Sequence, residues 1–342
     1  MVNYSRIALG LGLKELVYTE NMTKLINKTL IESNYNFTEL IEQIRKYYVL
    51  LNEGQLSLTA RLFSTTESDG MHIIGGATNY KTKSFIAMAQ PVFPWMREKA
   101  LPVATTSYIY SDYMTGELKA IVGGADTVLY RTPAKSALAA KYLAPKRDSY
   151  TLGLLGLGVQ ATTHAEAFCE TFNIKKIVGM SRTPNKWKHN IDSIEEKTGK
   201  KLELLSREEV IKQADILVVI TSAEEPLVHY KDLHKGQLVI GTDHAETVAK
   251  DVVLNADAVF VDYAPTAKGE PATIKILLDE GHKYDDLVDG DLLQLSTEDV
   301  VARKSEDDII FFQSLGVLCE NLAAVEYFYD KVGSDAEEFD FN

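Results

Sequence analysis

One glycine-rich segment of this 342-residue chain has the spacing of a phosphate-binding turn. It reads Gly156-Leu157-Gly158-Val159-Gln160-Ala161, and it lies between the apolar run 150–155 and a helical stretch that ends near Phe172. Gly156 allows a tight turn, Gly158 lets the backbone approach a pyrophosphate, and Ala161 permits close packing of helix on strand. The first N–H groups and the dipole of that helix favour phosphates. The pattern predicts a dinucleotide site, with a plain glycine turn as the alternative, and its expected contacts are Gly156, Gly158, Val159 and Gln160.

The end of the next apolar run bears on which dinucleotide is bound. A site for NAD places Asp or Glu there, where the carboxylate accepts hydrogen bonds from the ribose 2′-hydroxyl. Here the run ends in Ser181-Arg182-Thr183, with no carboxylate. Two hydroxyls and a guanidinium are donors suited to a 2′-phosphate. NADP(H) is therefore favoured, NAD(H) is the alternative, and an arginine in a surface loop would be the simpler explanation.

The elements that must position this turn follow from the hydrophobic pattern. From residue 150 onward, apolar runs such as 214–222, 237–243 and 257–263 alternate with helical stretches, which indicates a parallel sheet with helices on both faces. Between residues 58 and 123, short β-rich runs are broken by Gly, Pro, Asp and Ser, which suggests a mixed or antiparallel sheet. The chain is thus expected to belong to the α/β class.

Three further segments have simpler patterns. Residues 20–50 carry apolar positions at helical spacing and predict two helices, and the Ala/Leu-rich stretch 132–144 predicts another. Residues 308–332 predict a final long amphipathic helix with its entry loop, packed on the first part of the chain. The acidic stretch 334–342 predicts a solvated end.

Composition excludes several classes of protein. The chain has 36 basic and 49 acidic residues, so its net charge is −13, which does not suit nucleic-acid phosphates. No apolar run approaches the roughly 18 residues that cross a bilayer. Two cysteines and the lack of a leader pattern at the N-terminus indicate a cytoplasmic protein. The seven histidines form no metal-binding spacing, so no metal site, no nucleic-acid partner and no membrane association are predicted.

Four motifs together resemble the ornithine cyclodeaminase/mu-crystallin family. They are Asp112-Tyr113-Met114-Thr115-Gly116, the run from Tyr130-Arg131-Thr132 to Ala144, the glycine turn, and Gln313-Ser314-Leu315-Gly316-Val317. The resemblance covers about residues 58–330. The family contains ornithine and lysine cyclodeaminases, an archaeal-type alanine dehydrogenase, ketimine reductases and related imine reductases.

The resemblance implies a two-domain subunit that forms a homodimer through the sheet of its first domain. A Rossmann-type parallel-sheet dinucleotide domain, residues 132–304, would be inserted into an α+β substrate-binding and dimerisation domain, residues 1–131 plus 305–342. In the same way it implies roles for individual residues. Arg61 and Arg131 would hold the substrate carboxylate, which two guanidiniums can grip bidentately. Lys83 would contact the substrate near its reacting carbon, with Lys81 as the alternative register, and Asp243 would handle the proton or the amine.

Further cofactor contacts are expected at the ends of the strands and at the start of the Arg-Thr helix: Thr132, Thr221, Ser222, Ser314 and Gly316. The implied activity is that of an NAD(P)-dependent oxidoreductase acting on the Cα–N bond of a small amino acid or its imine. A cyclodeaminase that releases ammonia is the alternative, and a nucleotide- and small-ligand-binding protein is the second alternative. The chain departs from the family at residues 75–78 and 244–249, and residues 71–74 offer no carboxylate for a distal amine. These departures concern the identity of the substrate more than the class of reaction.

Overall fold

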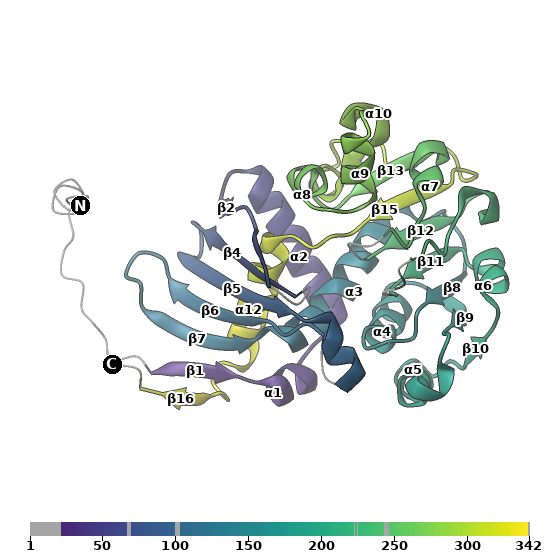
Figure 1. The fold of residues 1–342 in the computed structure, drawn as a ribbon. Helices are drawn as coiled ribbons and strands as arrows, with labels where there is room; N and C mark the ends of the chain where they lie inside the picture. Colours follow the sequence, from purple (N-terminus) through teal and green to yellow (C-terminus); the bar gives the residue numbers. More distant parts are fainter. Residues whose placement is uncertain are drawn as a thin grey trace.

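The structure, a computed structural model, describes residues 22–66, 70–99, 103–221, 223, 225–242 and 246–340. Two sheets lie side by side, and helices pack around and between them (Figure 1). The strands of the first sheet are β1 (Thr23–Ile26), β2 (Leu56–Leu58), β3 (Leu62–Thr65), β4 (Met71–Asn79), β5 (Ser84–Val92), β6 (Ser107–Asp112), β7 (Leu118–Gly123) and β16 (Glu337–Phe339). The strands of the second sheet are β8 (Tyr150–Leu155), β9 (Ile174–Met180), β10 (Leu202–Leu204), β11 (Ile216–Val219), β12 (Leu238–Gly241), β13 (Ala258–Val261), β14 (Gly290–Asp291) and β15 (Ile310–Gln313).

The helices fall into the same two groups. Those near the first sheet are α1 (Lys28–Ser33), α2 (Phe37–Asn52), η2 (Pro94–Lys99), α3 (Gly124–Leu143) and α12 (Leu318–Val332). Those around the second sheet are α4 (Ala161–Thr171), η3 (Pro184–Trp187), α5 (Lys188–Thr198), α6 (Arg207–Gln213), η4 (Tyr230–Asp232), α7 (Lys250–Asn255), α8 (Ala264–Gly269), α9 (Thr273–Asp279), α10 (Tyr284–Leu287) and α11 (Leu292–Thr297).

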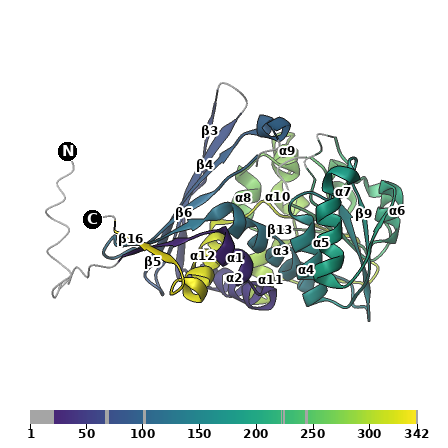
Figure 2. The same ribbon diagram turned by 90° about the horizontal axis from the view of Figure 1, so that it is seen from below.

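The first sheet is mixed, as predicted. Its order is β16-β1-β7-β6-β5-β4-β2, with β3 also paired to β4, and the β1–β7 pair is parallel while the other pairs are antiparallel. The helices α2, α3 and α12 pack against one face of it (Figure 2). Side chains alternate across the sheet, so Ile86 and Met88 are buried on that face while Ile74 and Ile109 are exposed on the other.

The second sheet is parallel throughout, with the order β10-β9-β8-β11-β12-β15-β13-β14. The residues of β8, β11, β12 and β13 are all buried, which explains why these strands are continuous apolar runs in the sequence. The predicted α/β class is confirmed.

Two local predictions are wrong. Residues 23–26 form β1 rather than part of a helix, and residues 310–313 form β15 between β12 and β13 rather than an entry loop. Periodicity alone does not separate a short buried strand from a helical segment. The acidic end is solvent-exposed, as predicted, although residues 337–339 also pair antiparallel with β1 as a short strand.

The domain boundary shifts accordingly. Because β15 lies in the parallel sheet, the chain leaves the nucleotide-side domain after Gln313 and not at residue 305. The helix α3 crosses the other predicted boundary at residues 131/132 without a break, so it belongs to both domains. The helix α12 packs on α2, α3 and β4, which confirms that the C-terminal helix returns to the first domain. Among the described residues, none of the helices has the length and apolar character needed to span a membrane.

Candidate active site

The glycine turn joins β8 to α4 at the carboxyl end of β8, as the sequence predicts. Gly156 has φ +110°, and a Cβ there would lie 2.6 Å from the backbone oxygen of Ile220, so only glycine fits. Its N–H donates to the carbonyl of Met180 at 3.0 Å. Gly158, in contrast, faces open space, since a Cβ built on it would have no atom within 4 Å. This open backbone next to the start of α4 fits the pyrophosphate of a dinucleotide.

A cavity of about 180 Å³ lies beside this turn. Six residues predicted to contact a cofactor line it together: Gly156, Gly158, Ser181, Arg182, Thr183 and Thr221. The Val159 side chain points to solvent and is 66% exposed. Gln160 directly precedes α4, and its Oε1 is buried without a hydrogen-bond partner.

Sequence reasoning missed three residues of this cavity region. The amide of Asn190 in α5 donates to the carbonyls of Leu157 (3.1 Å) and Gly158 (2.8 Å), and so fixes the turn from outside. Lys186 and Trp187 of η3 also line the cavity, which places a second cation near Arg182. The basic Lys186-x-Lys188 stretch, which begins three residues after Thr183, is the signal that could have identified the loop.

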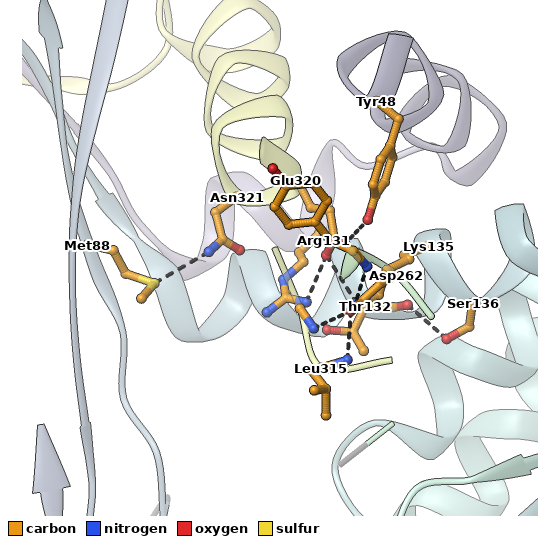
Figure 3. A network of polar contacts seen from close by, with 12 residues as sticks. Tyr48, Met88, Arg131, Thr132, Lys135, Ser136, Asp262, Leu315, Glu320 and Asn321 are labelled. Atoms are coloured by element: carbon orange, nitrogen blue, oxygen red, sulfur yellow. Dashed lines mark hydrogen bonds and ion pairs between the residues drawn. The ribbon is translucent and has the colours of Figure 1, made fainter. Parts of the chain in front are cut away.

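A second group of polar residues lies where the two domains meet (Figure 3). Arg131 and Lys135 are one turn apart on α3, and both point to Glu320 at the start of α12, with Arg131 Nη1 3.2 Å and Lys135 Nζ 3.3 Å from Glu320 Oε2. Lys135 Nζ also lies 2.9 Å from Asp262 Oδ2, just after β13. We call Arg131, Lys135, Asp262 and Glu320 the buried charge cluster.

Asp262 links this cluster to the segment after β15. Its Oδ2 accepts hydrogen bonds from the N–H groups of Leu315 and Gly316, both at 2.6 Å. Gly316 has φ +88°, and a Cβ there would lie 3.1 Å from Arg131 Nη1, so the loop packs directly on the arginine. Ser314 Oγ is buried without a partner. The predicted cofactor residues Ser314 and Gly316 thus adjoin the predicted substrate residue Arg131, and Thr132 is its neighbour on α3.

Only one side of the Arg131 guanidinium has a partner in the protein. Its Nη1 bonds to Glu320, but its Nε is buried without a hydrogen-bond partner. An orphaned donor on a buried guanidinium is costly, and a carboxylate would satisfy it. The Tyr108 hydroxyl is also buried without a partner. Burial raises the pKa of Tyr108 to about 12, against the opposing effect of the Arg131 charge, so the phenol is neutral.

Arg61 is committed differently. Its Nε donates to Glu270 Oε1 at 2.5 Å and its Nη2 donates to Glu270 Oε2, so the two side chains form a bidentate pair. Its Nη2 also lies 3.3 Å from the Leu315 carbonyl oxygen. Glu270 follows α8 in the nucleotide-side domain, so this pair joins the domains. Arg61 therefore lies beside the loop that adjoins the cluster, and Glu270 occupies the edge of its guanidinium that was expected to hold a substrate carboxylate.

Lys83 is not part of this site. It lies in the turn between β4 and β5, with φ +56°, its side chain exposed and its carbonyl bonded to the Tyr113 N–H. The strand position level with the cluster is Met88, five residues or roughly 15 Å further along β5. Met88 pairs with Gly75 and Tyr108, and its sulfur accepts a hydrogen bond of 3.4 Å from the Asn321 amide. The role predicted for Lys83 is therefore wrong, and the alternative Lys81 is equally exposed in the same turn.

Two predicted residues, Asp243 and Ser222, lie outside the described residues. In the sequence, Thr242 is the first residue after β12 and Asp243 is the second. Thr242 Oγ1 donates to the Val219 carbonyl at 3.1 Å. Within the part of the chain that the structure describes, no group of three or more His, Cys, Asp or Glu side chains is arranged to hold a metal ion.

The chain was compared with known proteins. The sequence model of the ornithine cyclodeaminase/mu-crystallin family matches residues 20–336. A Delta(1)-pyrroline-2-carboxylate reductase from Bacillus cereus is 30% identical over 226 residues, which cover 65% of this chain and 69% of the relative. The ketimine reductase mu-crystallin of Rattus norvegicus is 29% identical over 248 residues, which cover 69% of this chain and 72% of the relative.

Solved structures agree in fold. The Delta(1)-pyrroline-2-carboxylate reductase of Thermococcus litoralis, in complex with NADH and L-proline, superposes with a TM-score of 0.86 at 24% identity and covers 92% of this chain and 99% of its own. An archaeal alanine dehydrogenase dimer with bound NAD gives a TM-score of 0.83 at 21% identity, with 94% and 99% covered. Since the family model spans nearly the whole chain and both domains are matched, the chain belongs to the ornithine cyclodeaminase/mu-crystallin family.

Proposed function

We propose that this protein is an NAD(P)H-dependent reductase of a small cyclic imino acid such as 1-pyrroline-2-carboxylate. The observation that carries the proposal is the orphaned Nε of Arg131, buried where the loop of Ser314 and Gly316 meets the substrate-side domain. The match with this chain covers more than two thirds of the length of a Delta(1)-pyrroline-2-carboxylate reductase and of a ketimine reductase. A carboxylate held on Arg131 would place the adjacent Cα–N bond next to the nucleotide-side loop.

The side chains near the site suit a substrate without a charged side chain. A cyclic imino acid carries no distal charge, whereas ornithine carries a distal ammonium group that needs a carboxylate partner. The residues level with the cluster, Met88, Tyr108 and Asn321, are all neutral side chains. Among the described residues, the carboxylates Asp262, Glu270 and Glu320 are already paired with Lys135, Arg61 and Arg131. These neutral and paired side chains favour the reductase over the cyclodeaminase alternative.

The protein's contribution to the reaction is binding and orientation. The reduced nicotinamide, when bound, supplies a hydride to the Cα of the C=N bond. Arg131 holds the carboxylate, and the nitrogen must carry a proton for Cα to accept the hydride. We propose that Asp243, the second residue after β12 in the sequence, has the role predicted for it of favouring the protonated nitrogen, as a carboxylate near a cation does.

A substrate panel tests the proposed function. Purified protein is offered cyclic imino acids, keto acids with ammonia, and free diamino acids, and both nucleotide oxidation and ammonia release are followed. We expect oxidation of the nucleotide with cyclic imino acids. Ammonia released from ornithine without net nucleotide oxidation would indicate the cyclodeaminase, and nucleotide binding without turnover of any compound would indicate the binding protein.

We further propose that NADPH is preferred over NADH. Arg182 and Lys186 line the cavity beside the glycine turn, and no carboxylate follows β9 there to bind a ribose 2′-hydroxyl.

Arg182→Asp should weaken NADPH binding by about 1.5–3 kcal/mol through loss of a charge-assisted contact. NADH affinity, the internal control, should change by only a few-fold. The measurement is a fluorescence titration with each nucleotide, and wild-type protein that binds NADH more tightly than NADPH would contradict the preference.

We also propose a homodimer formed through the exposed face of the first sheet. Leu62, Ile74 and Ile109 project from the same face of the sheet on β3, β4 and β6, with β5 between β4 and β6, and they are 67%, 53% and 48% exposed. Apolar side chains gathered on one face mark an association surface. Light scattering should give twice the mass of one chain for the wild type. The double variant Ile74→Lys/Ile109→Lys should give the mass of one chain. A monomeric wild type would contradict this. The cytoplasmic location stays a prediction.

A further inference from the structure

Lys135 is the residue of the buried charge cluster for which the predicted chemistry has no use. Its side chain is completely buried in α3, although lysines are almost never fully buried without a partner. Its ammonium lies between two carboxylates from different parts of the chain, 2.9 Å from Asp262 and 3.3 Å from Glu320, and both of these are also inaccessible to solvent (Figure 3).

The Asp262 side of this arrangement controls the nucleotide-side loop. Asp262 Oδ2 accepts from Lys135 and from the N–H groups of Leu315 and Gly316, while Oδ1 accepts from the Tyr263 N–H at 2.9 Å. Burial by itself raises the pKa of the Asp262 carboxyl, but the Lys135 charge and these N–H groups outweigh it and hold that pKa below its ordinary value. The ionised carboxylate, and with it the loop conformation, therefore depends on Lys135.

The contact of Lys135 with Glu320 bears on Arg131, the arginine proposed to bind the substrate. Glu320 Oε2 accepts from Arg131 Nη1 and forms an ion pair with Lys135 Nζ, and Oε1 accepts from the Tyr48 hydroxyl at 2.5 Å. These contacts fix one side of the Arg131 guanidinium and leave Nε for a ligand. Without Lys135, two buried carboxylates would face a single guanidinium, and Arg131 would be drawn toward the uncompensated charge.

We propose that Lys135 is a positioning residue that holds the loop of residues 314–316 and the Arg131 guanidinium in one fixed arrangement, so that the folded enzyme binds its imino acid. This inference rests on the proposed function. Lys135 touches neither reacting atom, so its effect passes through Asp262 and Glu320. A displacement of about 1 Å at a binding group lowers rates by about 100-fold, which sets the scale of the effect.

The test compares Lys135→Met with Arg147→Met. Arg147 pairs with Asp215 at 2.8 Å in the nucleotide-side domain, away from the cluster, and controls for the loss of an ion pair. For Lys135→Met we expect the KM for 1-pyrroline-2-carboxylate to rise about tenfold or more, with a smaller fall in kcat. For Arg147→Met the melting temperature should fall while KM stays within about twofold. If Lys135→Met does not fold, Lys135→Gln replaces it.

A KM within about twofold of wild type in the folded Lys135 variant, whatever its melting temperature, would show that Lys135 only stabilises the fold and would overturn the proposal. Failure of the proposed function would be visible separately, as a wild-type protein that does not reduce the imino acid. In that case, amide hydrogen exchange of residues 313–317 in the presence of NADPH decides the loop half of the proposal. Faster exchange in the Lys135 variant than in both wild type and Arg147→Met supports it, and equal exchange overturns it.

Discussion

Arg131→Met should lower kcat/KM for a cyclic imino acid by about 10²- to 10³-fold, mainly through KM. The variant loses the buried Nε donor and the Nη1 contact with Glu320. Truncation of one partner in a buried, charged hydrogen bond costs about 2–5 kcal/mol, or about 30- to 5,000-fold, and the expected loss lies inside this range. The affinity for NADPH should change by only a few-fold, because Arg131 does not line the cavity beside the phosphate-binding turn. Initial rates and nucleotide fluorescence titrations measure the two quantities separately.

Two further variants control this prediction. Arg131→Lys keeps the charge but not the planar pair of donors, so it should recover only part of the loss. Arg45→Met removes an arginine whose partner, Glu42, lies on the exposed side of α2, and it should leave both kcat and KM unchanged. If Arg131→Met kept a normal KM, the carboxylate would have to be held elsewhere, and Arg61 would be the next candidate.

Gly158→Ala should abolish nucleotide binding while the protein stays folded. A Cβ at this position meets no protein atom within 4 Å, and it would occupy the space through which the backbone approaches a pyrophosphate. We expect the Kd for NADPH to rise about 100-fold or more, since a close approach to the phosphates is lost. The melting temperature without nucleotide should stay within about 2 °C of wild type.

Gly156→Ala is the matched comparison in the same turn. There the added Cβ would lie 2.6 Å from a backbone oxygen, and the residue would have to keep φ +110°. Strain and overlap together should lower the free energy of unfolding by about 3 kcal/mol or more. Chemical denaturation distinguishes the two variants. A Gly158→Ala protein with wild-type nucleotide affinity would show that the turn does not hold the phosphates.

The nucleotide side of the molecule was predictable because its signals are local. A strand, a glycine turn and a helix are consecutive in the sequence, and Gly156 and Gly158 have the conformation and the open space that this pattern demands. The parallel sheet followed from buried apolar runs such as β8. The family and the oxidoreductase class predicted from these motifs agree with the relatives that the chain matches.

The substrate side depends on contacts that no local pattern encodes. Asp262 and Glu320 meet Lys135 from separate elements of the chain, and Glu270 reaches Arg61 across the domain boundary. One signal was present, since a lysine in the middle of the Ala/Leu-rich stretch 132–144 must find a partner when that helix is buried.

The error at Lys83 has a geometric cause. Alternation along a strand fixes which residues share a face, but not where the hairpin turns. The turn between Asn79 and Ser84 takes Lys83 away from the cluster, and the alternating buried residues Ile86 and Met88 occupy the strand instead.

The most direct test of the central claim follows the hydride itself. Purified protein is given 1-pyrroline-2-carboxylate and reduced nucleotide that carries deuterium on the transferring position of the nicotinamide, and the product is analysed by mass spectrometry and NMR. The account predicts proline with one deuterium at Cα, formed in equal amount to the oxidised nucleotide. Proline without deuterium, or no reduction of any cyclic imino acid while ornithine releases ammonia, would contradict it.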